Sequence, residues 1–201
     1  MKRSIALALS MGLACVAHAQ SHELVKKWES EPNLKVPESV YLDTERNVLY
    51  VSNIDGEPWA DDKQGSIAKL SPDGKIIAAE WVTGLSAPKG LALHGKLLYV
   101  GDMSNVVVID VEKGAIAKRI AVPGAQGLND VAAAPDGTIY VSDSKGKQVF
   151  ALEDDKPTVY LENLKGPNGL LFHDGALHVL DSGSIYRVAA DRSLKRISGG
   201  I

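Results

Sequence analysis

Four polar residues occupy the same place in four similar segments of the chain. Each stands at the start of a short apolar run: Glu38, Lys89, Asn129 and Asn168. Three of the four carry a side-chain oxygen, and oxygen donors of mixed charge suit a hard cation such as Ca²⁺, with Mg²⁺ or Mn²⁺ as alternatives. Zn²⁺ is less favoured, because it prefers nitrogen and sulfur donors. If the four positions converge in space, the sequence predicts a divalent-cation site.

The segments that carry these residues form a repeat. Tyr50, Tyr99, Tyr140 and His178 are spaced by 49, 41 and 38 residues, and a period of about 40 residues is typical of propeller blades. Short apolar runs alternate with turn sequences such as 135–137, which indicates strands rather than helices. We therefore predict an all-β fold, a β-propeller of four-stranded antiparallel blades. In the third repeat the strands should cover 129–134, 138–143, 147–152 and 157–162.

The predicted fold brings the polar residues together. Inner strands of a propeller surround a central axis, and each of the four residues begins an inner strand on the face that we call the top face. We therefore expect them to surround the axis there. A different acid or amide ends the second strand of each repeat: Asn53, Asp102, Asp143 and Asp181. Because this position recurs in all repeats, we expect it to close a turn rather than to form a site.

The two ends of the repeat predict an incomplete ring. Residues 24–29 resemble an outer strand without inner partners, and propellers close their ring by lending such a strand to the last blade. Residues 194–197 already form a fourth outer strand, and 198–201 resemble the start of another blade. We expect four blades of a larger ring, with apolar residues of the last blade, including Ile185 and Val188, left exposed. A complete four-bladed ring is the alternative.

The N-terminus predicts export. Lys2 and Arg3 precede an apolar run over 5–16, and small residues before Gln20 suit a signal peptidase. We expect a signal peptide over 1–19, a propeller domain over 20–201, and a periplasmic or secreted protein. A lipoprotein signal at Cys15, the only cysteine, is the alternative. The apolar run is too short to span a bilayer, so no transmembrane segment is expected.

Charge argues against one class of partner. The formal net charge is −3, and removal of the two cations of the signal peptide leaves about −5. A mildly acidic domain gives no support for binding nucleic acid. We expect instead a small-molecule substrate or ligand on the top face.

Three motifs resemble those of the family of senescence marker protein, gluconolactonase and luciferin-regenerating enzyme. These are Pro-Glu-Ser-Val at 37–40, Leu-Asn-Asp-Val at 128–131 and Gly-Pro-Asn-Gly-Leu-Leu at 166–171. Residues 130–143 also resemble NHL repeats, whose blades are related. The motifs are short, although together the resemblance covers nearly all of the chain after the signal peptide.

The resemblance implies a six-bladed propeller that hydrolyses lactones or esters at one axial divalent ion. It assigns Glu38 and Asn168 as metal ligands, and Asn129 with Asp130 as residues that hold substrate or a water on the metal. The family's general base is an Asp from the following blade, which would lie beyond Ile201, so the catalytic residue is unknown. Lys89 departs from the family pattern by adding a cation near the axis, where it could contact substrate.

Each assignment has a structural alternative. Glu38 could pair with Lys89 without any metal, and Asn129 and Asn168 could cap backbone groups where their strands begin. A non-catalytic NHL-type propeller that binds a small ligand or a protein is therefore the alternative function.

One loop interrupts the repeat. Residues 54–65 form an insertion on the top face of the first blade, the same face as Glu38. Long loops on a rigid scaffold often carry function. Trp59 could cover a ligand there, and a loop without function is the alternative.

Overall fold

The computed structural model describes residues 24–199, and the predicted signal peptide lies outside the described residues. These residues form sixteen β-strands and no helix. The strands are β1 (Pro37–Asp43), β2 (Val48–Asn53), β3 (Gly65–Leu70), β4 (Ile76–Leu85), β5 (Pro88–His94), β6 (Leu97–Asp102), β7 (Asn105–Asp110), β8 (Ala115–Ala121), β9 (Leu128–Ala133), β10 (Ile139–Asp143), β11 (Gln148–Glu153), β12 (Lys156–Leu161), β13 (Pro167–His173), β14 (Ala176–Asp181), β15 (Ser184–Val188) and β16 (Leu194–Gly199). No helix in this part of the chain could therefore cross a membrane.

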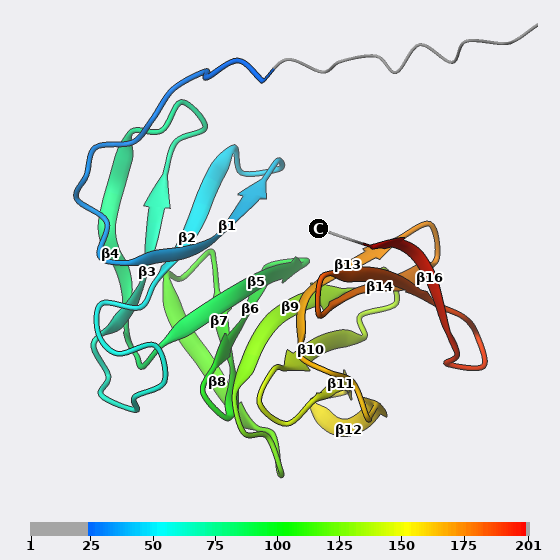
Figure 1. Ribbon diagram of the computed structural model, residues 1–201. Coiled ribbons are helices and arrows are strands. Elements are labelled where there is room, and N and C mark those ends of the chain that lie inside the picture. The colour runs from blue at the N-terminus through cyan, green and yellow to red at the C-terminus, as the bar shows by residue number, and fades with distance from the viewer. Residues whose placement is uncertain (1–23, 200–201) are drawn as a thin grey trace, which may run out of the picture.

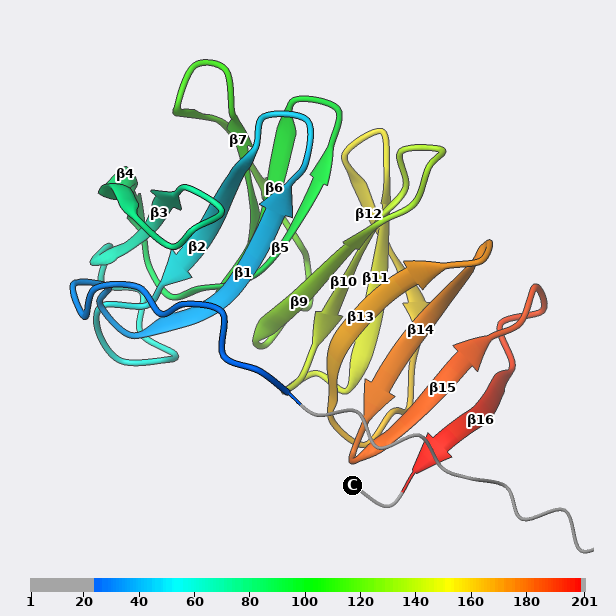
Figure 2. The same ribbon diagram turned by 90° about the horizontal axis from the view of Figure 1, so that it is seen from above.

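The strands form four separate antiparallel sheets, each built from four consecutive strands. We number these blades one to four in chain order. The first strand of each blade is innermost, and the inner strands pack on one another in the order β1, β5, β9 and β13. The blades form an arc, with the first and fourth on either side of an opening (Figures 1 and 2). The predicted all-β propeller blades are confirmed.

Apolar side chains fill the space between neighbouring blades. Tyr50 faces the second blade in one cluster, and Val106, Val108 and Leu128 are fully buried in the next. A third cluster, which includes Leu177, lies between the third and fourth blades. Alternate residues of a strand point to opposite faces of its sheet. The second and third blades, which have a neighbour on each side, therefore bury apolar side chains on both faces. Burial between blades therefore holds the arc together.

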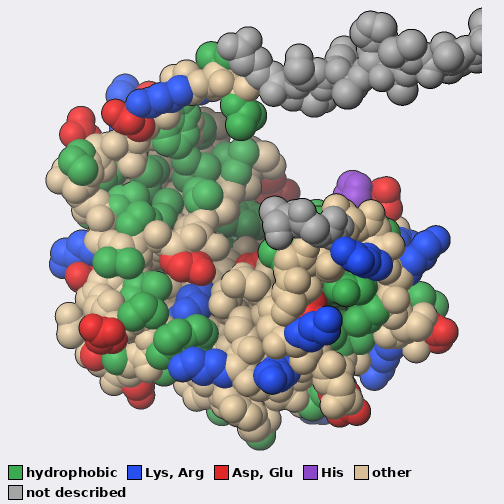
Figure 3. Space-filling model, in the orientation of Figure 1, with side chains coloured by type: hydrophobic (Ala, Val, Ile, Leu, Met, Phe, Trp, Pro, Cys, Tyr) green, Lys and Arg blue, Asp and Glu red, His purple; other side chains and the backbone are tan. Residues whose placement is uncertain are grey.

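The outer faces of the two terminal blades carry exposed apolar residues. On the first blade Val40 is 64% exposed, and Figure 3 shows apolar side chains gathered over this blade beside the opening. On the fourth blade Leu171 is 60% exposed, and Leu180 and Ile185 line an apolar cavity of about 510 Å³ with it. In the closed ring of a propeller, such faces are covered by neighbouring blades.

Two details differ from the sequence-based expectations. Val188 is 3% exposed, because it points into the cluster between the third and fourth blades while Ile185 points to the other face. The two residues are three positions apart, an odd number, so a strand places them on opposite faces. Residues 24–29 form no strand in the structure; a side chain at Gly74 would collide with Trp28, which therefore packs on the turn between β3 and β4.

Candidate functional site

The four polar residues at the inner-strand starts are structurally equivalent. Each is the second residue of its strand: Glu38 of β1, Lys89 of β5, Asn129 of β9 and Asn168 of β13. Because the inner strands pack side by side, these positions lie along one edge of the arc, on the top face. Glu38 and Asn168 are exposed, whereas Lys89 and Asn129 are buried. The structure thus gives the two predicted metal ligands access to solvent.

Glu38 lies in a field of mixed charge. Although the residue is exposed, neighbouring protein atoms partly shield its carboxyl from water and raise its pKa; a hydrogen bond from Ser39 lowers the pKa, and the nearby Asp130 and Lys89 act in opposite directions. The net shift is upward, so the protein around Glu38 compensates its negative charge incompletely. A cation bound beside this carboxylate would supply the missing compensation.

Asp130 connects three blades. One carboxylate oxygen accepts the N–H of Leu170 in the fourth blade at 2.7 Å, and the other accepts that of Val131 at 2.9 Å. A side chain at Gly90 in the second blade would collide with Asp130, so the two inner strands approach closely. Burial raises the pKa of Asp130 despite these hydrogen bonds. Its oxygens thus position β13, and their predicted contact with substrate stays a prediction.

Ser142 fixes the backbone next to the second predicted ligand. Its hydroxyl accepts the N–H of Asp130 at 2.9 Å and donates to the carbonyl of Asn168 at 2.7 Å. The backbone of Asn168 is therefore held by the third blade while its side chain remains exposed. Sequence reasoning missed Ser142, because nothing in a repeat shows which hydroxyl reaches the next blade.

Lys89 does not form the ion pair with Glu38 that the sequence left open. Its ammonium group donates to the carbonyls of Pro58 at 2.7 Å and Ala87 at 2.9 Å. It also lies 4.0 Å from the centroid of the Trp59 ring. Burial is the main reason that the pKa of Lys89 is lowered. Lys89 therefore attaches the inserted loop to the second blade.

The inserted loop crosses the top face and contacts the second and third blades. We call residues 54–64, between β2 and β3, the Trp59 loop; the same connection has two residues in the second and fourth blades and four in the third. Asp61 contacts the hydroxyl of Ser86, to which Lys63 also donates. Trp59 lies against Gly127 in the third blade. The loop therefore reaches from the first blade across the second to the third.

The acids that end the second strands close turns in three blades, as expected. Asp102, Asp143 and Asp181 each accept backbone N–H groups from the segment before the inner strand of their own blade. Asn53 is different, because its buried amide oxygen has no partner among the described residues. In the preceding segment Val36 has a φ of 53°, which is unusual for a β-branched residue.

A divalent cation would have to use amide and water oxygens as well as Glu38. Residues 24–199 contain no group of three or more His, Cys, Asp and Glu side chains that could hold a metal. One exposed carboxylate with incompletely compensated charge and one exposed amide nevertheless suit Ca²⁺, which accepts such mixed oxygen donors. The two side chains thus offer donor types that suit a hard cation, and their role as ligands stays a prediction.

Comparison with known proteins establishes the fold. No family model matches the sequence, and no curated protein matches it. Among solved structures, a catalytically inactive virginiamycin B lyase from Staphylococcus aureus, with quinupristin, has a TM-score of 0.63 at 15% identity. That match covers 83% of this chain and 57% of the lyase chain.

Two further propellers match at similar levels. The gluconolactonase XC5397 from Xanthomonas campestris has a TM-score of 0.57 and 17% identity, over 74% of this chain and 55% of the other. A chain of the nidogen/laminin complex has a TM-score of 0.65 and 20% identity, over 82% of this chain and 65% of the other. This chain therefore has the β-propeller fold, with four blades in residues 24–199, and spans just over half the length of the lyase and the gluconolactonase.

Proposed function

We propose that this chain belongs to an exported, six-bladed propeller enzyme that hydrolyses a lactone or another ester at an axial divalent cation. The observation that carries the proposal is the equivalence of Glu38 and Asn168. They stand at the same strand position in the first and fourth blades, both are exposed, and the charge of Glu38 is incompletely compensated. The likeness to a gluconolactonase fold supports this reading.

Each residue at the top face has a part in this proposal. Glu38 and Asn168 hold the cation, most favourably Ca²⁺, and Ser142 keeps the backbone of Asn168 in place. When bound, the cation polarises the ester carbonyl and supplies several kcal/mol of transition-state stabilisation. Asn129 and Asp130 orient the substrate, and Trp59 covers it. No residue of 24–199 is assigned as the general base.

Export to the periplasm or the cell exterior is part of the same proposal, because it follows from the signal-peptide pattern over 1–19. The top face takes a small molecule rather than nucleic acid, since the chain is mildly acidic. Small lactones and esters are therefore the substrates to test first.

The decisive test combines thermal stability with lactone hydrolysis. We expect millimolar Ca²⁺ or Mn²⁺ to raise the melting temperature by mass action, and Glu38→Gln to abolish that rise. Glu162→Gln is the matched control, because Glu162 directly follows the outer strand β12, is exposed, and forms no ion pair within residues 24–199. Equal responses of the two variants to the cation would exclude Glu38 as a ligand. Hydrolysis of glucono-1,5-lactone that needs no cation would exclude the metal mechanism.

A binding propeller without catalysis is the second candidate. The match to a chain of the nidogen/laminin complex, a protein assembly, favours it. In that case neither the cation nor Glu38→Gln should affect hydrolysis, because there would be none above background.

A further inference from the structure

Two lysine ammonium groups meet at the indole ring of the Trp59 loop. The Nζ atom of Lys89 lies 4.0 Å from the ring centroid, and that of Lys145 lies 4.1 Å from it. The lysines come from different blades, since Lys89 belongs to β5 and Lys145 to the loop between β10 and β11. Cations over an aromatic face are attracted to its negative quadrupole. Two cations at one ring nevertheless concentrate positive charge.

The charge of Lys89 has no counter-ion in direct contact. Its ammonium group is bound by two carbonyls, and it forms no ion pair within the described part of the chain. Glu38 and Asp102 act on it from a distance, but burial and the proximity of Lys145 outweigh them and lower the pKa of Lys89. Asp102 is itself occupied by backbone N–H groups of Ser86 and Ala87. Lys89 is thus a buried source of positive potential.

Lys145 completes the arrangement with an accessible charge. The residue is exposed, its stem packs on Gly127, and it forms no ion pair with any residue of 24–199. An exposed lysine usually moves freely, but this one is held between Gly127 and the indole. Its ammonium group is therefore placed in advance beside an aromatic surface, and such preorganisation favours binding.

We propose that Trp59 and Lys145 form a subsite for a carboxylate group of the ligand, so that the preferred substrates are lactones that keep a free carboxylate, such as monolactones of aldaric acids, rather than neutral lactones. The inference rests on the proposed function, because it concerns the same top face. The carboxylate contacts the ammonium group of Lys145 and the edge of the Trp59 ring. Lys89 is a positioning residue: it holds the loop through Pro58 and adds positive potential without contact.

The test compares an anionic with a neutral probe. D-Glucarate carries two carboxylates, and D-glucitol is a neutral polyol of the same carbon number. Both are titrated into the chain by calorimetry, in low-salt buffer stripped of divalent cations. We expect glucarate to bind more tightly than glucitol and Lys145→Gln to weaken glucarate binding about two- to fivefold, the effect of one exposed charge pair. Lys147→Gln, the same charge change in the same exposed loop, should leave glucarate binding unchanged.

Several results would overturn the subsite. These are no glucarate binding to the unaltered chain, equal affinity for glucitol, or equal effects of the two lysine variants. Tryptophan fluorescence gives an independent readout, because glucarate should change the emission of the unaltered chain and not that of Trp59→Phe. The titration contains no divalent cation, so its outcome is separate from that of the cation site. Glucarate binding with no stabilisation by Ca²⁺ would refute the proposed metal enzyme and keep the carboxylate subsite. Stabilisation by Ca²⁺ with no glucarate binding would refute the subsite and keep the metal enzyme.

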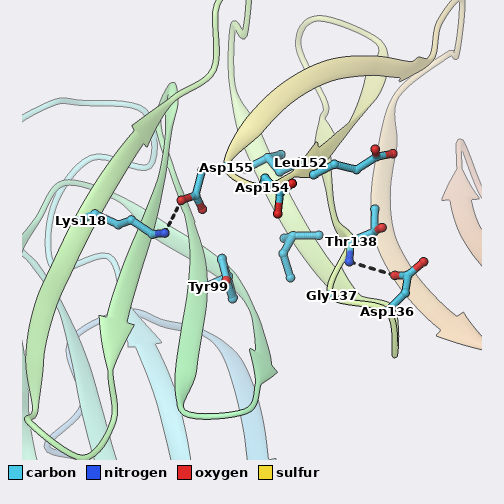
Figure 4. A pocket seen from close by; sticks show the side chains of 10 residues that line it. Tyr99, Lys118, Asp136, Gly137, Thr138, Leu152, Asp154 and Asp155 are labelled. Atoms are coloured by element: carbon cyan, nitrogen blue, oxygen red, sulfur yellow. Dashed lines mark hydrogen bonds and ion pairs between the residues drawn. The ribbon is translucent and has the colours of Figure 1, made fainter.

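Another cavity shows no feature that requires a ligand. It measures about 570 Å³ and lies between the second and third blades, where Lys118 contacts Asp155 across it (Figure 4). Its acidic residues include Asp154 and Asp155, which both have positive φ in the turn between β11 and β12. Such turns favour Asp for conformational reasons, so the acidity needs no ligand to explain it.

Discussion

Between the second and third blades, Val106, Val108 and Leu128 are fully buried, whereas on the top face Glu38 and Asn168 are exposed and Lys89 is buried without a contacting acid. The first region repeats from blade to blade, because every neighbouring pair must bury the same kind of apolar surface. The second differs at each blade, although the residues occupy equivalent positions. The apolar contacts that all neighbouring blades share thus stabilise the fold, and the polar residues that differ from blade to blade are the candidates for chemistry.

The largest loss of unfolding free energy should follow from creating a cavity in the apolar core between two blades. Leu128→Ala removes a fully buried side chain from the cluster between the second and third blades and should cost about 3–5 kcal/mol of unfolding free energy. Leu171→Ala, at a position that is 60% exposed, should cost less than about 0.5 kcal/mol. Urea unfolding measures both. Similar losses would mean that the outer face of the fourth blade is covered in solution.

The next largest effect concerns the acids that close turns. Asp143 is fully buried and accepts the N–H groups of Gln126, Gly127 and Gly146 at 2.8–2.9 Å. Asp143→Ala leaves these donors without a partner and should cost about 2–4 kcal/mol. Asp136→Ala removes one exposed turn bond to Thr138 and should cost about 1 kcal/mol or less. If the two variants unfold at the same urea concentration, the turn-closing role is wrong.

In the first blade, the residue that ends the second strand should contribute less to stability. Asn53 occupies the position of Asp143, but its amide oxygen has no partner in the described structure, and its amide nitrogen donates only over 3.4–3.5 Å. Asn53→Ala should therefore cost only about 1 kcal/mol, well below Asp143→Ala. The same unfolding experiment measures it. An equal cost at both positions would show that Asn53 closes its turn in solution as the aspartates do.

The smallest expected effect is electrostatic and depends on pH. Because the pKa of Glu38 is raised in the folded state, its protonated form is favoured there and ionisation destabilises the fold. The destabilisation is absent below the ordinary glutamate pKa and is complete above the raised one. Without divalent cations, Glu38→Gln should therefore stabilise the chain at neutral pH by less than about 1 kcal/mol, since Glu38 is exposed.

That stabilisation should disappear in acid. Melting curves of the unaltered chain and Glu38→Gln, recorded from neutral pH to below the glutamate range, should converge as the pH falls. A difference that persists unchanged in acid would assign the effect to packing rather than to charge.

The sequence predicts the blades well, because spacing and turn residues report local structure. The four strands of the third blade were expected to begin at 129, 138, 147 and 157. In the structure they begin at Leu128, Ile139, Gln148 and Lys156. The positions at the starts of the inner strands follow from the same repeat. Local patterns can reveal these features because each blade forms from consecutive residues.

Side-chain contacts between blades could not be predicted from local sequence patterns. The bond from Lys89 to Pro58 spans 31 residues, and that from Leu170 to Asp130 spans 40. Lys145 has no feature in the sequence that sets it apart from other lysines, and only the inserted Trp59 loop signalled that something would cover the top face. Side-chain partners across blades depend on the curvature of the arc, which a repeat does not specify.

The central claim is that Glu38 and Asn168 hold one divalent cation, and anomalous scattering from crystals soaked in millimolar Mn²⁺ tests it most directly. The account predicts an anomalous peak within coordination distance, about 2.0–2.6 Å, of a Glu38 carboxylate oxygen and the Asn168 amide oxygen. The peak should be missing from Glu38→Gln crystals soaked in the same way. A peak elsewhere on the molecule, or none beside Glu38, would contradict the claim.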